Sequence, residues 1–174
     1  MPALTNDRLT PSRNAEYADY PVRANTVIYN GALVALITSG TGAGFAVPAS
    51  DAANRVILGV AQARADNTSG TDGAKRVVVA FNRAFKFNPV GSFTPADIGR
   101  SVYAVSDNEV SLSPQTNGVK VGKLIAIDAD GVWVYIHAPA PPNRAATNTV
   151  DGTYDANEAA VINSLRALLN DYTI

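Results

Sequence analysis

The chain has 174 residues, of which 47% are hydrophobic and 17% charged, with 14 basic against 15 acidic side chains. This length suits one domain with a substantial core, and the balanced charge excludes a field strong enough to hold a nucleic acid through its phosphates. The absence of cysteine excludes disulfides and thiolate metal sites. No apolar run approaches the roughly 18 residues that span a bilayer, so we expect a protein made in a cytoplasm that binds neither nucleic acid nor membrane.

Residues 1–19 form the first predicted segment, an N-terminal arm. They are polar, include Pro2 and Pro11 and show no sustained period, so we expect an extended arm that does not fold on itself. Tyr17 and Tyr20 lie where this arm meets the body. Large rigid aromatics can anchor an arm in a partner's pocket, and packing against the first strand of the body is an equal alternative.

Residues 20–138 form the second predicted segment, a β-rich body. Short runs of β-branched and aromatic residues are separated by Gly, Asn, Asp and Pro roughly every ten residues, which is typical of a small β-barrel or sandwich. The fold class is therefore mainly β. The predicted strands are residues 26–29, 32–38, 45–47, 56–63, 76–81, 85–87, 101–105, 109–112, 119–127 and 132–137.

Three turns punctuate this body. Asn30-Gly31 and Asp130-Gly131 are typical of type I′ turns, because both central residues of that turn need positive φ, and they predict two hairpins. The segment from Thr94 to Gly99 combines a hydroxyl cap, Pro95 at the first position and a terminal glycine, which predicts one short helical turn.

A linker over residues 139–152 and a helix over residues 153–174 complete the chain. Pro139, Pro141 and Pro142 cannot join a sheet ladder and favour an extended linker. The helix is predicted from about Asp155, which can cap it. It either folds back onto the body or packs on another subunit, and we expect the second because the linker leads it outward. The predicted interface residues of the helix are Val161, Ile162, Leu165, Leu168, Leu169 and Tyr172, which share one broad apolar face.

No catalytic, cofactor or metal residue is predicted. His137 is the only histidine and ends a predicted strand, which makes it an ordinary strand-end residue. The glycine-rich run of residues 40–44 is followed by a strand, whereas a phosphate cradle needs a helix there, so a hairpin tip is expected. Gly70–Lys75 lacks the spacing of a nucleotide-binding loop.

Two acidic groups are also interpreted as turn residues. Asp128 and Asp130 resemble a fragment of a calcium loop, but the remaining oxygen ligands are missing. Asp66, Asn67 and Asp72 are residue types that a glycine-rich β connection uses for its turns. We therefore expect no cofactor and no enzymatic activity.

Four segments carry a resemblance to a known family. They are Arg23–Leu36, Gly59–Ala61 leading into Asp66–Gly70, Asp97–Asp107, and Val121–Val134. In this order they are similar to the capsid cement, or decoration, proteins of bacteriophages, over roughly residues 22–136. The resemblance implies a small β domain on the outer surface of a phage head, part of the virion, that bridges neighbouring copies of the major capsid protein.

Physical reasoning adds two expectations and two alternatives. A cement protein needs contacts spread over several subunits, and we expect a homo-oligomer, a trimer or dimer that matches a local symmetry axis. The first alternative is a head-fibre or tail structural protein. The second is a β module that binds a ligand such as a carbohydrate, which an exposed cluster of aromatic side chains would support.

Overall fold

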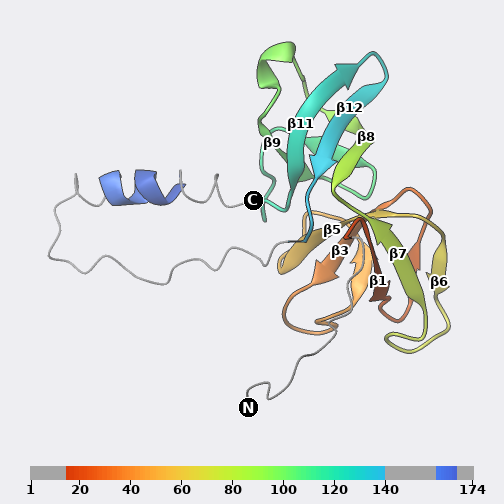
Figure 1. Cartoon of the computed structure of the whole chain (residues 1–174). Helices are drawn as coiled ribbons and strands as arrows, with labels where there is room; N and C mark the ends of the chain where they lie inside the picture. The colour runs from red at the N-terminus through yellow and green to blue at the C-terminus, as the bar shows by residue number, and fades with distance from the viewer. Residues whose placement is uncertain (1–14, 140–159, 168–174) are drawn as a thin grey trace, which may run out of the picture.

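The computed structural model describes residues 15–139 and 160–167, and it is mainly β as the sequence predicts (Figure 1). Every predicted strand overlaps an observed one. The elements are β1 (Tyr17–Pro21), β2 (Thr26–Ile28), β3 (Leu33–Ile37), β4 (Ala46–Pro48), β5 (Arg55–Ala61), β6 (Ala65–Asn67), β7 (Arg76–Ala80), β8 (Arg83–Val90), the 3₁₀ helix η1 (Pro95–Asp97), β9 (Ser101–Ala104), β10 (Glu109–Ser111), β11 (Lys120–Asp128) and β12 (Gly131–Ile136).

The strands form two lobes (Figure 1). The first lobe is a five-stranded sheet in the order β1-β7-β5-β3-β4, accompanied by a two-stranded ribbon of β2 and β6. The second lobe is a closed barrel in the order β10-β8-β12-β11-β9. The chain crosses from the first lobe to the second once, between β7 and β8. The sequence predicted a barrel or a sandwich, and the structure combines a barrel with an open sheet.

The inner strands β3 and β5 of the first lobe are buried on both faces. Leu33, Ala35 and Ile37 of β3 belong to one core, while Val34 and Leu36, which point to the opposite face, pack in another. A strand buried on both sides needs a continuous apolar run rather than alternation, and β3 has the sequence LVALI. Val22, Ile28 and Ala65 complete the second core from the ribbon side.

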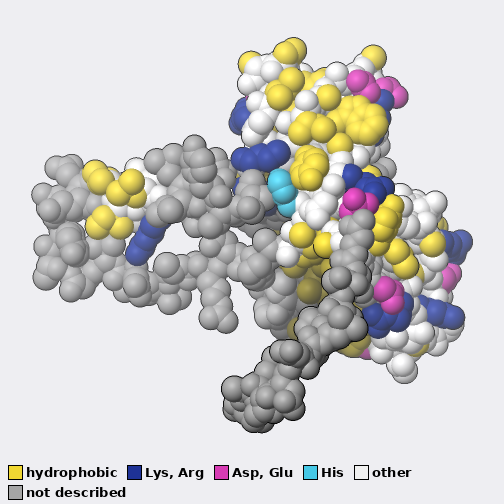
Figure 2. Space-filling view, in the orientation of Figure 1, with side chains coloured by type: hydrophobic (Ala, Val, Ile, Leu, Met, Phe, Trp, Pro, Cys, Tyr) yellow, Lys and Arg dark blue, Asp and Glu magenta, His cyan; other side chains and the backbone are white. Residues whose placement is uncertain are grey.

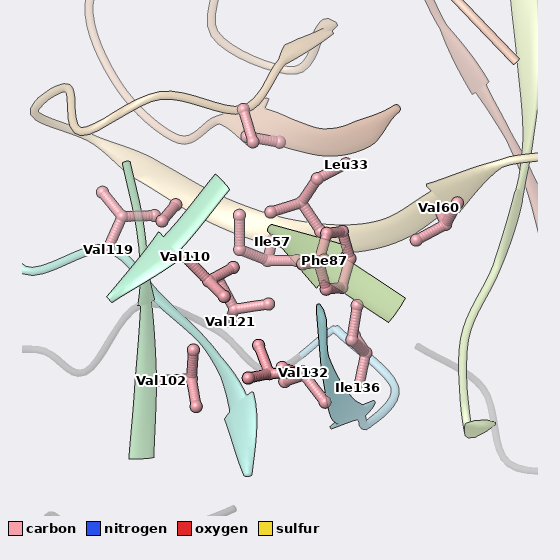
Figure 3. Packing of buried hydrophobic residues seen from close by; sticks show 14 of the residues in the cluster. Leu33, Ile57, Val60, Phe87, Val102, Val110, Val119, Val121, Val132 and Ile136 are labelled. Atoms are coloured by element: carbon pink, nitrogen blue, oxygen red, sulfur yellow. The ribbon is translucent and has the colours of Figure 1, made fainter. Parts of the chain in front are cut away.

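The first core is shared between the lobes. Figure 3 shows Leu33 and Ile57 of the sheet lying against Phe87 of the barrel. Val102, Val110, Val121, Leu124 and Val132 are among the residues that the barrel strands contribute to this core. Because one apolar cluster joins sheet and barrel, separating the lobes would expose the interiors of both to water.

Glycine at position 59 allows two strands of the sheet to approach each other. A Cβ at Gly59 would lie 2.1 Å from the carbonyl oxygen of Ala80, and its φ of +137° is a conformation that other residues rarely adopt. The register of β3 against β5 shifts at this point, with Val34 opposite Gly59 and Ala35 opposite Ile57. Gly59 therefore lies at a bulge in the middle of the sheet.

The two predicted type I′ turns are wrong in type. At Asn30-Gly31 only Gly31 has positive φ, and the N–H of Ala32 donates to the carbonyl of Tyr29, as in a type II turn. This turn makes no hairpin, because β2 pairs with β6 and not with β3.

The second turn does close a hairpin, between β11 and β12, but one residue earlier than predicted. Asp128 pairs with Gly131, which leaves Ala129 and Asp130 in the turn, and neither has positive φ. A Cβ at Gly131 would lie 3.0 Å from the carbonyl oxygen of Phe87. Glycine at this position therefore allows β8 to approach closely.

The predicted helical turn is confirmed as η1. The Thr94 N–H and hydroxyl donate to the Asp97 carboxylate at 2.8 and 2.7 Å. The pKa of Asp97 is lowered, first by the Thr94 hydroxyl and then by Arg100, whose guanidinium lies 2.6 Å away.

Two strands were not predicted, and one of them changes a boundary. Residues 17–19, assigned to the arm, belong to β1, which pairs antiparallel with β7. The pairing places Tyr20 opposite Val77, and Tyr20 packs on the second core.

The rest of the predicted arm, residues 1–14, and the predicted linker after residue 139 lie outside the described residues. The predicted helix is described over residues 160–167, where it is helical. In the part of the chain that the structure describes, no helix is long and apolar enough to cross a membrane.

Candidate functional site

Asn82, between β7 and β8, joins the two ends of the body. Its Nδ2 donates to the carbonyl of Ala15 at 2.9 Å, and its Oδ1 accepts from the N–H of Ala138 at 2.8 Å. Its own N–H donates to the carbonyl of Ile136 at 2.7 Å. Its φ of +56° is a left-handed conformation that Asn tolerates better than most residues. One side chain therefore holds the start and the end of the described body at the crossing between the lobes.

Further bonds hold the N-terminal end at this junction. The N–H of Phe81 donates to the carbonyl of Glu16 at 3.0 Å, and the Glu16 carboxylate pairs with Arg83 at 3.0 Å. The same guanidinium lies 5.0 Å from the ring centre of Tyr17. Residues 15–17 and 136–138 are consequently held together at the Asn82 junction.

Tyr17 and Tyr20, the predicted aromatic anchors, lie in β1. Tyr20 is partly buried against the second core, which is the local packing that the sequence left as an alternative. Tyr17 is 42% exposed and points to the other face, where Arg83 covers its ring. Of the two, Tyr17 has the surface with which to contact a partner.

The helix of residues 160–167 exposes its apolar side chains. Val161 is 59% and Leu165 54% exposed, and Ile162 is less exposed than either. Leu168, Leu169 and Tyr172, the other predicted interface residues of the helix, lie outside the described residues. The structure brings none of the described helix residues into either core of the body.

The edges of the open sheet are poor templates for an added strand. Bonds at Glu16–Phe81 and Val22–Lys75 show that the even-numbered residues of β1 bond to β7, so the odd-numbered ones face the free edge. There Pro21 has no N–H, and the carbonyl of Asp19 already accepts from the Arg76 side chain. At the opposite edge, β4 ends in Pro48. Proline and side-chain caps of this kind hinder edge-to-edge pairing at β1 and β4.

A charged cluster lies at the tip of the β11–β12 hairpin. Trp133 Nε1 donates to Asp128 at 2.7 Å, while the Lys86 ammonium pairs with Asp128 at 3.0 Å and also with Asp130. The pKa of Asp128 is lowered by the Trp133 bond first and by Lys86 second. The pKa of Lys86 is raised by Asp130 and Asp128. The acidic residues that resembled a calcium loop therefore bind a lysine and an indole of their own barrel.

The residues considered for another cation site also serve the chain itself. Asn67 is buried, and its Nδ2 lies 3.0 Å from the carbonyl oxygen of Arg23 and 2.9 Å from that of Thr71. Asp66 binds Arg64 and Thr68, and Asp72 accepts from the N–H of Ala24 at 2.7 Å. Within residues 15–139 and 160–167, no group of three or more metal-ligating side chains comes together.

His137, predicted as the last residue of its strand, lies one residue beyond the end of β12 and belongs to an aromatic row. Along β12, Val132, Val134 and Ile136 are buried in the barrel, so Trp133, Tyr135 and His137 point outward. The rings of Tyr135 and His137 meet edge to face at 4.8 Å, and Lys86 lies 5.7 Å from the Trp133 ring centre. Figure 2 shows hydrophobic side chains gathering on this side of the barrel.

Comparison of the chain with protein-family models, with curated proteins and with solved structures finds no match in any of the three.

Sequence reasoning missed Asn82 and the aromatic row. Alternation along residues 132–137 carried a signal for the row, since every second residue there is aromatic. Asn82 had no such signal, because its partners lie 56 and 67 positions away in the chain.

Proposed function

We propose that this chain is a non-catalytic capsid cement protein that binds the outer surface of a phage head and stabilises contacts between major capsid proteins. The observation that carries the proposal is the Asn82 junction, which holds both ends of the β body at one place. Segments leaving a body at one point can reach neighbouring subunits from the same docked position, and their contacts then add through effective concentration.

The β body suits the role of a rigid spacer between capsid subunits. A single core runs through sheet and barrel, and the barrel has no free edge. Rigid bodies lose little conformational entropy when they dock, so more of the contact energy remains as affinity.

The C-terminal helix suits the role of the docking or oligomerisation element. Val161 and Leu165 lie four residues apart on one helix face and are more than half exposed. Burying this face against a second copy or a shell subunit would remove its apolar surface from water. A homo-oligomer, a dimer or trimer, is part of the proposal.

The test is co-sedimentation of the purified protein with expanded phage shells that lack it. The full chain is compared with chains that begin at Ala15 or end at Pro139, because these cuts leave the Asn82 bonds in place. We expect saturable binding by the full chain, weaker binding by both shortened chains, and greater resistance of the decorated shells to heat.

An unrelated β protein of similar size serves as the control for trapping in the pellet. Absence of saturable binding by the full chain would contradict the proposal. Equal binding by all three chains would place the contacts on the body and contradict the role given to the ends. Mass spectrometry of separated heads and tails tests the related alternative of a head-fibre or tail protein.

The aromatic row on β12 supports a second candidate, a carbohydrate-binding module. Aromatic side chains in a row on a rigid strand can pack on sugar rings, and Asp128 beside Trp133 could accept hydrogen bonds from hydroxyl groups. Trp133 fluorescence during titration with glycans tests this candidate, with Trp133→Phe as the silent control. Saturable quenching without shell binding would favour it over the cement.

A further inference from the structure

Two arginines of the sheet lobe lack the carboxylate partners that other arginines have. Arg64, Arg76, Arg83 and Arg100 each form an ion pair with an Asp or Glu. Arg23 and Arg55 form none within the described residues, although both are partly buried. A partly desolvated guanidinium without an anion is unfavourable. Arg23 and Arg55 therefore differ from the four arginines that have a carboxylate partner.

The Arg55 guanidinium has an unused donor. Its Nε is shielded from solvent and donates no hydrogen bond. A buried donor left unpaired costs about 1–3 kcal/mol, and more when the group is charged. An acceptor from another molecule, reached by a change of the Arg55 rotamer, would remove this cost.

The two arginines lie beside the same glycine loop. A Cβ on Gly42 would come within 2.9 Å of Arg23 Nε and 3.0 Å of Ile37 Cδ1, so the Arg23 side chain lies directly against this glycine. Ile37 is the cross-strand partner of Arg55, and paired residues in an antiparallel sheet point to the same face. The charge of Arg23, after burial, lowers the pKa of Arg55, which agrees with this proximity.

The loop itself offers unused backbone donors. Gly40, Gly42 and Gly44 have φ between +79° and +89°, whereas the residues between them do not have positive φ. Successive N–H groups in such an alternating conformation form concave anion-binding nests. Within the described residues, the N–H groups of Gly40, Thr41 and Gly42 donate no hydrogen bond.

We propose that Arg23, Arg55 and the loop of residues 40–44 form a binding site for an oxyanion, a carboxylate or phosphate group. Guanidinium groups bind both kinds of oxyanion through paired N–H donors. The site is separate from the Asn82 junction and the helix. Its test is therefore independent of the test of the proposed cement function.

The test is a titration of the full chain with inorganic phosphate and, separately, with acetate, at ionic strength held constant with sodium chloride. The Nε–Hε signal of Arg55 and the amide signal of Gly42 are followed by ¹H–¹⁵N NMR. We expect saturable shifts of both signals with at least one of the two anions. The anion that saturates at the lower concentration identifies the oxyanion class.

Four variants test whether binding is specific to this site. Arg23→Gln removes one charge, and Gly42→Ala displaces Arg23 and strains the loop at φ +83° without changing the charge. Each should weaken the apparent affinity about tenfold or more, the usual effect of losing a charge-assisted hydrogen bond. Arg55→Lys retains the charge without the Nε donor and should also weaken binding. The matched control, Arg64→Gln, removes an arginine that already has a carboxylate partner and should change the affinity less than about twofold.

Dispersed amide spectra show that each variant folds. Shifts that do not saturate with either anion would overturn the inference. Saturable shifts that Arg23→Gln and Gly42→Ala leave unchanged, or that Arg64→Gln weakens equally, would overturn it as well, since binding would then be general attraction to positive charge.

Discussion

The β body and the helix of residues 160–167 use their apolar residues in opposite ways. In the body, Leu33, Leu58 and Leu124 are at most 1% exposed. In the helix, Val161 and Leu165 are more than half exposed. Short helices draw most of their stability from tertiary packing, and none of the described helix residues belongs to either core, so we expect the helix to pack on another surface. Under the proposed function, this contrast assigns folding and association to different segments of one chain.

The largest loss of stability is expected from Leu33→Ala. Leu33 lies in the core that sheet and barrel share, and truncating a buried leucine lowers the free energy of unfolding by about 2–5 kcal/mol. Urea unfolding followed by tryptophan fluorescence and by circular dichroism measures the loss. We expect both signals to shift together, because one core joins the lobes. Two separate transitions would contradict the shared core.

The next largest effect is expected at the junction. Asn82→Gly keeps the left-handed backbone available but removes the bonds to Ala15 and Ala138, which should lower the free energy of unfolding by about 1–3 kcal/mol. The matched control is Asn54→Gly, at an exposed residue with φ +58°. Hydrogen exchange should also become faster at Ala138 in the first variant. Equal effects of the two substitutions would show that backbone conformation alone matters.

A smaller effect is expected from Trp133→Phe at the hairpin tip. The indole bond is the main cause of the lowered pKa of Asp128, ordinarily 3.8, so the variant should raise this pKa toward its ordinary value. A carboxylate whose folded pKa is lowered stabilises the fold above its unfolded pKa, and this contribution is lost as the pH falls through the folded pKa. The variant should therefore lose less stability than the native chain on acidification below about pH 4.

Carbon-detected NMR of the carboxyl groups measures this titration directly. Asp97 is the internal control, because its lowered pKa has other causes, Thr94 and Arg100. Movement of both pKa values by the same amount would contradict the local origin of the shift at Asp128.

The smallest effect on stability is expected from the pair Val161→Ser and Leu165→Ser. Because neither side chain belongs to a core of the body, the urea midpoint should stay within experimental error. Sedimentation velocity should show the association of the native chain weakened in the variant. The matched control, Ser164→Ala, changes a neighbouring position on the same helix. A lowered midpoint would show that the helix packs on its own body.

The sequence predicted the strands better than their partners. The run of residues 33–37 is recognised as a strand by its continuous apolar residues, and the run of 132–136 by its β-branched and aromatic residues. β6, with the sequence ADN, has no such composition, and it forms because Asn67 binds carbonyl groups that lie 44 and 45 positions earlier. The division into sheet and barrel was not predicted, since it depends on long-range pairs such as the parallel ladder of β8 and β10.

The candidate surfaces were predicted in part. The spacing of Val161 and Leu165 predicted a helix face, and the structure exposes it. The Asn82 junction and the Arg23–Arg55 pair are formed by segments distant in sequence, and neither has a local pattern. The predicted turn types were wrong for a related reason: Gly131 is required by the neighbouring strand β8 rather than by its own turn.

The most direct test of the division between folding and association compares the chain of residues 15–139 with the full chain. Urea unfolding and sedimentation velocity are measured on both at several concentrations. We predict the same unfolding midpoint for the two chains, a monomer for residues 15–139 and a larger assembly for the full chain. A body that unfolds without its ends, or two chains that sediment as the same oligomer, would contradict the account.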